Sequence, residues 1–266
     1  MKNTIINGYE PILQAHRGVE CEYPQNTMVS FRAAVEQGYG MIELDPGVTK
    51  DHKIVILHNK TVNATARYDD GRELEEETML SSLTLDEVRK LDFGIFFSEK
   101  FKGERIPLLS DVLKLAEENG VGLKIDNKLR HFPEEDLRTV FSMFAETKAK
   151  ICVSCWNHEI IERVLRELPH AEVHVDCMTD PGELSWLASV APREKVVVWL
   201  PVDREKASWV KDGFATPESV ANVKKFFRLG LWAVKDRESY DRILSDYRPD
   251  FVETSGQFKP RSGRKK

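Results

Sequence analysis

The stretch that decides the fold spans residues 11–58 and reads PILQAHRGVECEYPQNTMVSFRAAVEQGYGMIELDPGVTKDHKIVILH. Its first apolar run ends at His16 and Arg17, and a second run, MIELD, carries Glu43 and Asp45. Polar side chains at the ends of apolar strands are where a barrel or an open α/β sheet keeps its chemistry. The stretch therefore predicts two strands whose ends carry functional groups.

The segments between and after these two runs predict a helix and a hairpin. Asn26 or Thr27 can cap a helix that ends at Gly38. Glu43 and Asp45 are two residues apart, so both point to one face of their strand. Residues 48–57 then have the pattern of a hairpin with a turn at Asp51-His52-Lys53, which folds His58 back towards the two carboxylates.

Beyond residue 108 the chain alternates regularly between apolar runs and helical patterns. Further strands are expected at 121–128, 151–156, 171–177, 195–201, 231–234 and 251–254. Helices are expected at 82–91, 109–119, 133–148, 158–168, 181–190, 216–229 and 237–247. Strands separated by helices in this way predict βα units, and eight of them predict an α/β fold of the (β/α)8 TIM-type barrel. An open doubly wound sheet is the alternative, but no G-x-G-x-x-G follows any strand.

The same pattern predicts the domain organisation. We expect a single catalytic barrel domain at 1–256, with a small insertion after strand two at about 59–108, and a basic C-terminal tail at 257–266. Excursions as long as this insertion usually form lids or binding loops.

Composition excludes several classes of protein. The chain is 41% hydrophobic and 31% charged, with a formal net charge of −5. It shows no basic face for nucleic acid, no apolar run of the ~20 residues that a transmembrane segment needs, and no apolar core of a secretory signal in its first eight residues. A cytoplasmic location is therefore expected. Cys152 and Cys155 have half the spacing of a zinc site, but strand alternation sends them to opposite faces, so free thiols are expected.

The expected strand ends carry a set of polar and aromatic residues. They are His16 and Arg17, Glu43 and Asp45, Asp126 and Lys128, Trp156, Asp176, Trp199, Trp232 and Lys235, and Glu253. Three carboxylates from neighbouring strands would repel one another unless a divalent cation lies between them, and oxygen ligands favour Ca²⁺ or Mg²⁺. Trp156, Trp199 and Trp232 either belong to the core or form walls of a substrate pocket.

A cation beside Arg17 and Lys128 makes a positive pocket that suits a small phosphodiester substrate. His16 and His58 suit acid and base roles, because imidazole titrates near neutral pH. The residues do not decide which histidine is the acid. Attack by a neighbouring hydroxyl of the substrate is as consistent with them as attack by water.

Together, His16-Arg17-Gly18, Pro24-Gln25-Asn26-Thr27, Glu43-Leu44-Asp45, Thr49-Lys50-Asp51 and His58 resemble the glycerophosphodiester phosphodiesterase family. Ile125-Asp126-Asn127-Lys128, Trp232-Ala233-Val234 and Glu253-Thr254 resemble its later motifs. The resemblance implies a TIM-type barrel, one divalent cation (Ca²⁺ or Mg²⁺), and hydrolysis of glycerophosphodiesters of lipid metabolism to an alcohol and glycerol phosphate.

The resemblance also implies roles for single residues. His16 and His58 correspond to the catalytic pair. Glu43, Asp45 and Asp126 correspond to the metal ligands, and Arg17 and Lys128 to the phosphate contacts. Apart from the resemblance, their positions at strand ends make Trp156 and Trp232 further candidates for substrate binding.

Three departures from the family pattern leave alternatives open. Gln25 and Asp126 stand where the family usually has Glu, and Asn59 where it has Asp. They favour, as one alternative, a catalytically silent barrel that binds phosphorylated ligands. Another is a lysophospholipase D-like enzyme, for which the run Ile95-Phe96-Phe97 and Phe101 would supply an apolar mouth. The head group of the substrate and the oligomeric state, a homodimer included, are not decided by the sequence.

Overall fold

The computed structural model describes residues 9–260 of the chain. Its main sheet has the strand order β1-β10-β9-β8-β7-β6-β5-β2, which is that of a closed barrel, so the predicted (β/α)8 barrel is confirmed. Its strands are β1 (Ile12–Ala15), β2 (Met41–Leu44), β5 (Gly122–Ile125), β6 (Ile151–Cys155), β7 (Glu172–Asp176), β8 (Val196–Pro201), β9 (Arg228–Trp232) and β10 (Phe251–Thr254). The helices are α1 (Met28–Glu36), α2 (Leu85–Val88), α3 (Leu109–Asn119), α4 (Glu134–Glu146), α5 (His158–Glu167), α6 (Pro181–Val190), α7 (Pro217–Phe226) and α8 (Arg237–Asp246).

The chain divides into two compact units. One contains the described residues up to Gln14 together with Cys152–Thr254, and the other contains Ala15–Ile151 with the described residues from Ser255. The single domain at 1–256 and the tail stay predictions, and residues 1–8 and 261–266, which carry the predicted absence of a signal sequence and most of the tail, lie outside the described residues.

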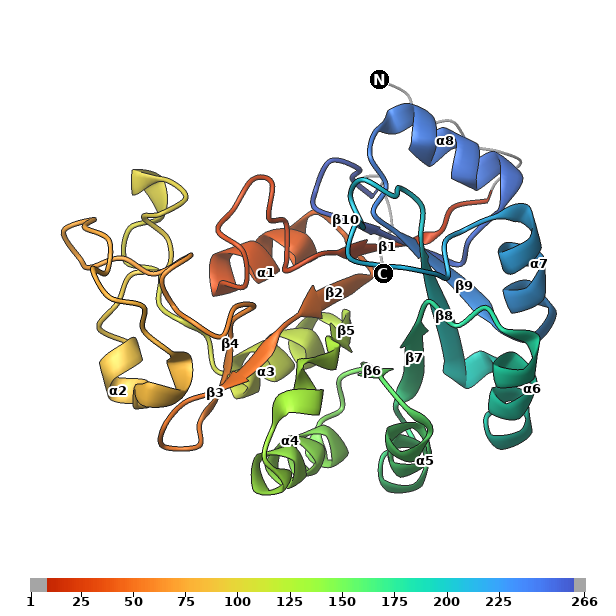
Figure 1. The fold of residues 1–266 in the computed structure, drawn as a ribbon. Coiled ribbons are helices and arrows are strands. Elements are labelled where there is room, and N and C mark those ends of the chain that lie inside the picture. Colours follow the sequence, from red (N-terminus) through yellow and green to blue (C-terminus); the bar gives the residue numbers. More distant parts are fainter. Residues whose placement is uncertain (1–8, 261–266) are drawn as a thin grey trace. The chain divides into compact units, whose positions relative to one another are not determined.

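In the first unit, strands β6 to β10 pair in parallel, each with the next. Figure 1 shows helices α5, α6 and α7 along one side of strands β7 to β9. The strands read as apolar runs because they are buried: Val173, Val197 and Leu229 are each fully inaccessible.

Strand β9 differs from its prediction. Helix α7 ends at Phe226 rather than 229, and the strand begins at Arg228 rather than 231. Gly230 therefore lies inside the strand and does not end the helix. Its hydrogen faces the ring of Trp199, because a Cβ atom there would stand 2.4 Å from Trp199 Cδ2. The glycine marks a close approach of a side chain to a backbone, a use that sequence alone does not distinguish from a helix end.

In the second unit, β2 and β5 pair in parallel, and β3 (Pro46–Val48) and β4 (Ile54–Ile56) form an antiparallel hairpin. The predicted hairpin is thus confirmed. The Leu57 backbone N–H donates to the Asp45 carbonyl at 2.8 Å, which brings the end of the hairpin back beside the end of β2.

The insertion that follows the hairpin has its own hydrophobic cluster. Val62, Val88 and Phe93 pack there against Val55 and Leu57 of the hairpin. The predicted helix at 82–91 is shorter than expected: α2 begins after the Thr84 capping box and ends at Val88. The 3-10 helices η1 (Leu80–Ser82) and η2 (Glu99–Phe101) lie before and after it.

Strand β5 is also shorter than predicted. It ends at Ile125 rather than 128, and the 3-10 helix η3 (Asn127–His131) follows. The Asp126 side chain caps η3 by accepting from the Lys128 backbone N–H. A side chain that bonds to a backbone group two residues on favours a turn over continued strand, so Asp126 and Lys128 lie beyond the strand.

No helix among residues 9–260 is long and apolar enough to cross a membrane. The cytoplasmic location stays a prediction.

Candidate active site

Three carboxylates meet at the ends of β2 and β5. Glu43 lies within β2, Asp45 directly follows it, and Asp126 directly follows β5. One oxygen from each of the three side chains lies within 4.8 Å of the others. They meet because neighbouring parallel strands end at the same edge of the sheet, as predicted from the sequence.

Two of these carboxylates are buried and held by specific donors. Glu43 is 4% and Asp45 is 1% exposed. The Arg17 backbone N–H donates to Glu43 Oε2 at 3.0 Å, and Asn26 Nδ2 donates to Asp45 Oδ2 at 2.8 Å. Arg17 Nε lies 3.3 Å from the same Asp45 oxygen. Because buried charges are costly unless paired or metal-bound, this concentration of negative charge indicates a cation site.

The donor set fits a hard divalent cation. Carboxylate oxygens at 2.0–2.6 Å from Mg²⁺ or Ca²⁺ lie up to about 5 Å from one another, which matches this cluster. Asp126 belongs to the cluster although it is one methylene shorter than the family's usual Glu. The family-based expectation of a divalent ion therefore has a set of residues in this structure that could hold it.

Two other groups of possible ligands are organised differently. In the group Cys152, Glu172 and His174, Arg228 Nη2 lies 2.9 Å from Glu172 Oε2 and supplies a positive charge. In the group His52, Glu135 and Asp136, the His52 and Glu135 side chains are 58% and 72% exposed, and His52 is bonded to Asp136. The cluster at β2 and β5 differs from both, because its ligands are all carboxylates and two of them are buried.

His16 is oriented by a carboxylate. Its Nδ1 lies 2.5 Å from Glu20 Oε1, and its Nε2 lies 4.0 Å from Glu43 Oε2. Ser255 Oγ also donates to Glu20 Oε1. Burial alone would raise the pKa of the Glu20 carboxyl, but the bonds from His16 and Ser255 and the charge of Arg17 bring it below its usual value. Sequence analysis missed Glu20, whose only signal is its place four residues after His16.

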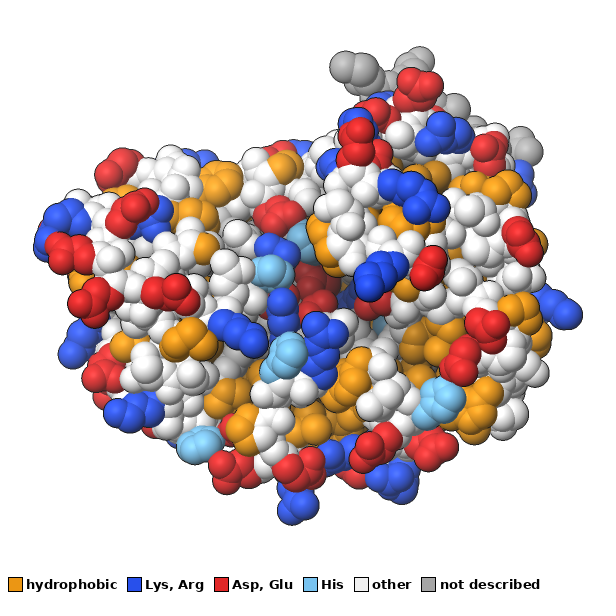
Figure 2. Space-filling model, viewed as in Figure 1, with side chains coloured by type: hydrophobic (Ala, Val, Ile, Leu, Met, Phe, Trp, Pro, Cys, Tyr) orange, Lys and Arg blue, Asp and Glu red, His pale blue; other side chains and the backbone are white. Residues whose placement is uncertain are grey.

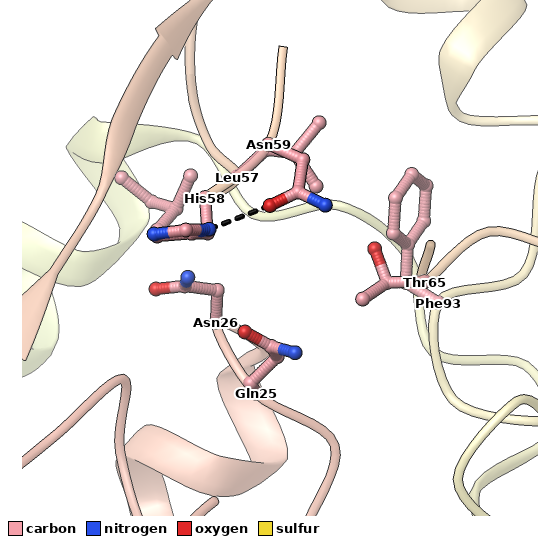
Figure 3. Close-up of a pocket in the computed structure, with 8 residues that line it drawn as sticks. Gln25, Asn26, Leu57, His58, Asn59, Thr65 and Phe93 are labelled. Carbon is pink, nitrogen blue, oxygen red and sulfur yellow. Dashed lines mark hydrogen bonds between the residues drawn. The ribbon is translucent and has the colours of Figure 1, made fainter. Parts of the chain in front are cut away.

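His58 is oriented by an amide instead. Its Nδ1 lies 2.6 Å from Asn59 Oδ1 (Figure 3). Because an amide oxygen only accepts, the neutral His58 ring carries its proton on Nδ1, which leaves a lone pair on Nε2. Burial lowers the pKa of the His58 imidazole, and the charges of Arg17 and Lys128 act in the same direction, whereas Asp45 and Asn59 oppose them.

A small cavity adjoins His58, lined by Gln25, Asn26 and Thr65 among others (Figure 3). Its volume of about 20 Å³ is enough for one water molecule. Asn26 Oδ1 and Thr65 Oγ1 are buried and have no hydrogen-bond partner among residues 9–260, so both could bond to such a water.

Arg17 adopts a left-handed backbone conformation, with φ of 51°. Its Nη1 donates to Gln25 Oε1 at 2.7 Å. The following residue must be Gly18, because a Cβ atom there would stand 2.2 Å from Ser30 Oγ. The tight turn therefore points the Arg17 backbone N–H at Glu43, while the neutral Gln25 adds no negative charge beside the guanidinium, which pairs with Asp45.

The remaining predicted site residues belong to the other compact unit. Trp199 is a core residue, because it is fully buried and its Nε1 donates to His174 Nδ1 at 2.9 Å. Trp232 ends β9 with its ring 5.9 Å from that of Trp209, and Trp156 follows β6. Substrate binding by Trp156 and Trp232 stays a prediction.

Fold and site together define a class: an α/β barrel with a carboxylate cluster, two histidines and two cationic side chains at its strand ends. Figure 2 shows histidine, basic and acidic side chains close together on one face. Comparison with known proteins narrows this class.

The model of the glycerophosphoryl diester phosphodiesterase family matches residues 16–179. A glycerophosphodiester phosphodiesterase of Caldanaerobacter subterraneus is 34% identical over 237 residues, which cover 86% of this chain and 88% of that protein. The chain therefore belongs to the glycerophosphoryl diester phosphodiesterase family, and the prediction of an enzyme of this family is confirmed.

Solved structures agree in fold. A phosphodiesterase of Oleispira antarctica, in complex with the product sn-glycerol-3-phosphate, has a TM-score of 0.73 at 17% identity and covers 94% of this chain and 95% of its own. A glycerophosphoryl diester phosphodiesterase of Parabacteroides distasonis has a TM-score of 0.71 at 16% identity and covers 95% of this chain and 85% of its own.

Proposed function

We propose that this protein hydrolyses glycerophosphodiesters to an alcohol and glycerol phosphate in a reaction that depends on a divalent cation and on His16 and His58. The observation that carries the proposal is the meeting of Glu43, Asp45 and Asp126 at one sheet edge. The two histidines support it, because each has its Nδ1 occupied by a neighbouring side chain.

The three carboxylates would hold Ca²⁺ or Mg²⁺, and that ion would stabilise negative charge on the phosphoryl oxygens. Arg17 and Lys128 add two fixed positive charges for the phosphate. Arg17 is held in place by Gln25 and Asp45, and Lys128 by the short helix that Asp126 caps.

The contacts favour different roles for the histidines. His58 pairs with a neutral amide and has a lowered pKa, so it is unprotonated at neutral pH and its Nε2 can accept a proton from the attacking hydroxyl. His16 pairs with the ionised Glu20, which stabilises an imidazolium that can donate a proton to the leaving alkoxide. We therefore assign His58 as the base and His16 as the acid.

The test compares the variants His16→Ala and His58→Ala, with His170→Ala, an exposed histidine outside the site, as the control. Each site variant should lose about 100-fold or more in kcat on glycerophosphodiesters, because general acid–base catalysis contributes that much. Melting temperatures should show that the fold is kept. Near-wild-type rates in both site variants would contradict the proposal.

A second substrate separates the two roles. A 4-nitrophenyl ester of glycerol phosphate has a leaving group that needs no proton, so His16→Ala should regain most of its rate on it. His58→Ala should stay inactive, since the attacking hydroxyl still has to lose its proton. Recovery of the His58 variant instead would reverse the assignment.

The other candidate functions have less support. Phe101 packs on Tyr23, with ring centroids 5.4 Å apart, and both line a pocket with Lys100 and Arg32 that does not include His58. Phe97 is exposed and packs against Phe96 and Phe101, so the apolar mouth for a lysophospholipid stays a prediction. A silent barrel would bind Ca²⁺ or Mg²⁺ yet release no product, which the same turnover assay detects.

A further inference from the structure

A large pocket opens beside the site, within the compact unit that contains the carboxylate cluster. Its volume is about 530 Å³, and His58 and Lys128 belong to its lining. The rest of the lining comes from the β3–β4 hairpin and the residues that follow it up to Lys60, from Met79–Ser81 of the insertion, and from η3 and the start of α4. Pockets of 300–1,000 Å³ are the usual size for small-molecule ligands.

The position of this pocket suits one arm of a phosphodiester. If the proposed function holds, the phosphate lies between Arg17, Lys128 and the carboxylate cluster. The charges of Asp45 and Lys128 both affect the pKa of His58, which lines the pocket. His58 therefore lies close to the carboxylate cluster as well as to the pocket. Because Lys128 would contact the phosphate and also lines the pocket, one ester substituent of the phosphate can extend past Lys128 into the pocket.

The charges that line the pocket are mostly positive. Lys50, Lys60 and Lys128 contribute ammonium groups, and no carboxylate within residues 9–260 lies within ion-pair distance of them. The one lining carboxylate, Asp136, is already bonded to His52 at 2.9 Å. Figure 2 shows basic and histidine side chains beside one another on this face.

The imidazole of His131 also lines the pocket, and its pKa is affected by the same positive charges. Its pKa lies below the usual value because of burial, followed by the charges of Arg130, Lys60 and Lys128. The pocket therefore attracts an anion, which lysines bind as compact point charges.

The uncharged residues that line the pocket do not favour a cationic ligand. Val48, Leu57, Leu80 and Phe132 line the pocket with carbon, and Phe132 is its one benzene-type ring. Recognition of a quaternary ammonium needs aromatic faces around it, which a single ring beside three lysines does not provide. A choline head group would thus meet repulsion without compensation.

We infer that this pocket binds the alcohol portion of the substrate and selects alcohols that carry a second phosphate group. Lys50 and Lys60 are the specificity-determining residues. The inference rests on the proposed phosphodiesterase reaction and adds the class of its preferred substrate.

The experiment compares three glycerophosphodiesters. Glycerophosphocholine has a cationic alcohol, glycerophosphoglycerol a neutral one, and bis(glycerophospho)glycerol an alcohol that carries a second phosphodiester. At low ionic strength, kcat/KM should be highest for the third and lowest for the first. Added salt should reduce this preference, since exposed charges are screened over about 10 Å at 0.1 M.

The double variant Lys50→Gln/Lys60→Gln tests the residues. The ratio of kcat/KM for bis(glycerophospho)glycerol to that for glycerophosphoglycerol should fall about tenfold, the combined effect of two exposed charge pairs. The matched control Lys102→Gln/Lys114→Gln removes two lysines that lie outside the pocket and should keep the wild-type ratio.

Each outcome decides between the two proposals. Turnover of none of the three substrates would overturn the proposed function itself. Turnover with equal efficiency, with a preference for glycerophosphocholine, or with a ratio that the pocket variant does not change, would leave the phosphodiesterase in place and overturn the inference about the pocket.

Discussion

Two amides, Gln25 and Asn59, contact the charged and titrating groups of the site. Gln25 accepts from Arg17, and Asn59 accepts from His58. Amides keep the hydrogen-bond geometry of carboxylates but add no charge, so they orient both side chains and stabilise a positive charge on them less than a carboxylate would. The presence of Asn59, where the family usually has Asp, therefore bears most directly on the pKa of His58.

Replacing Asn59 by Asp should raise the pKa of His58. A carboxylate at Nδ1 stabilises the imidazolium, whereas burial alone favours the neutral ring. The acid limb of kcat/KM should move to higher pH in Asn59→Asp. NMR titration of the His58 ring measures the pKa directly, and Asn119→Asp, at the end of α3, is the control.

The lowered pKa of His58 also determines how the stability of the fold changes with pH. The folded pKa of His58 lies below the unfolded value of about 6.5, so the unfolded chain binds the proton first as pH falls. The contribution of His58 to stability is therefore complete above that pH and is lost below it. Urea unfolding at pH 5.5 and 7.5 should show a smaller loss in Asn59→Asp; an equal or larger loss would contradict this reasoning.

At the scale of elements, the insertion is organised by one buried carboxylate. Asp92 is fully buried and accepts from the backbone N–H groups of Gly94, Ile95 and Gly103. Burial raises the pKa of its carboxyl, but the three bonds and the charge of Arg105 outweigh this and lower it. The Asp92 side chain thus holds both ends of the segment between Phe93 and Glu104 together.

Asp92→Ala should loosen this segment while the barrel stays folded. Bonds to a charged acceptor contribute about 1.5–3 kcal/mol each, so the loss of all three bonds should cost at least ~4 kcal/mol locally. Hydrogen exchange should become faster at residues 94–103 and stay slow in the barrel strands. Asp70→Ala, which removes an exposed partner of Arg72, should change exchange little; protected amides at 94–103 in the Asp92 variant would disprove this role.

A glycine inside a strand provides a second prediction at this scale. Gly230→Ala places a Cβ against the buried Trp199 ring and should destabilise the protein by about 1–3 kcal/mol. Gly122→Ala is the matched control in another strand, since its Cβ would meet its nearest atoms at an ordinary 3.5 Å. Thermal unfolding of both variants tests the difference, and equal melting temperatures would contradict it.

At the scale of the whole molecule, stability should depend on a divalent cation. Binding to the carboxylate cluster only in the folded state stabilises by about 2.7 kcal/mol at 100 times Kd. Mg²⁺ or Ca²⁺ should therefore raise the melting temperature of the EDTA-treated protein and restore turnover. In Asp45→Asn the rise should be much smaller, whereas an equal rise in this variant would place the cation elsewhere.

The sequence by itself determined the barrel and most of the candidate site. Each strand is an apolar run because it is buried, and the polar residues of the site directly follow such runs in the chain. Both patterns can therefore be recognised within a short stretch of sequence. The spacing of Glu43 and Asp45 and the return of His58 by the hairpin could be read in this way.

Only the tertiary structure decided the partners and the exact register. Glu20 and Ser255 meet at His16 although 235 residues separate them. Gly230 belongs to a strand because Trp199 packs on it, and Asp126 and Lys128 leave β5 because the Asp126 side chain caps a short helix. The lysine-lined pocket likewise gathers residues from three separate segments. Such contacts depend on packing between distant parts of the chain, which a local pattern does not encode.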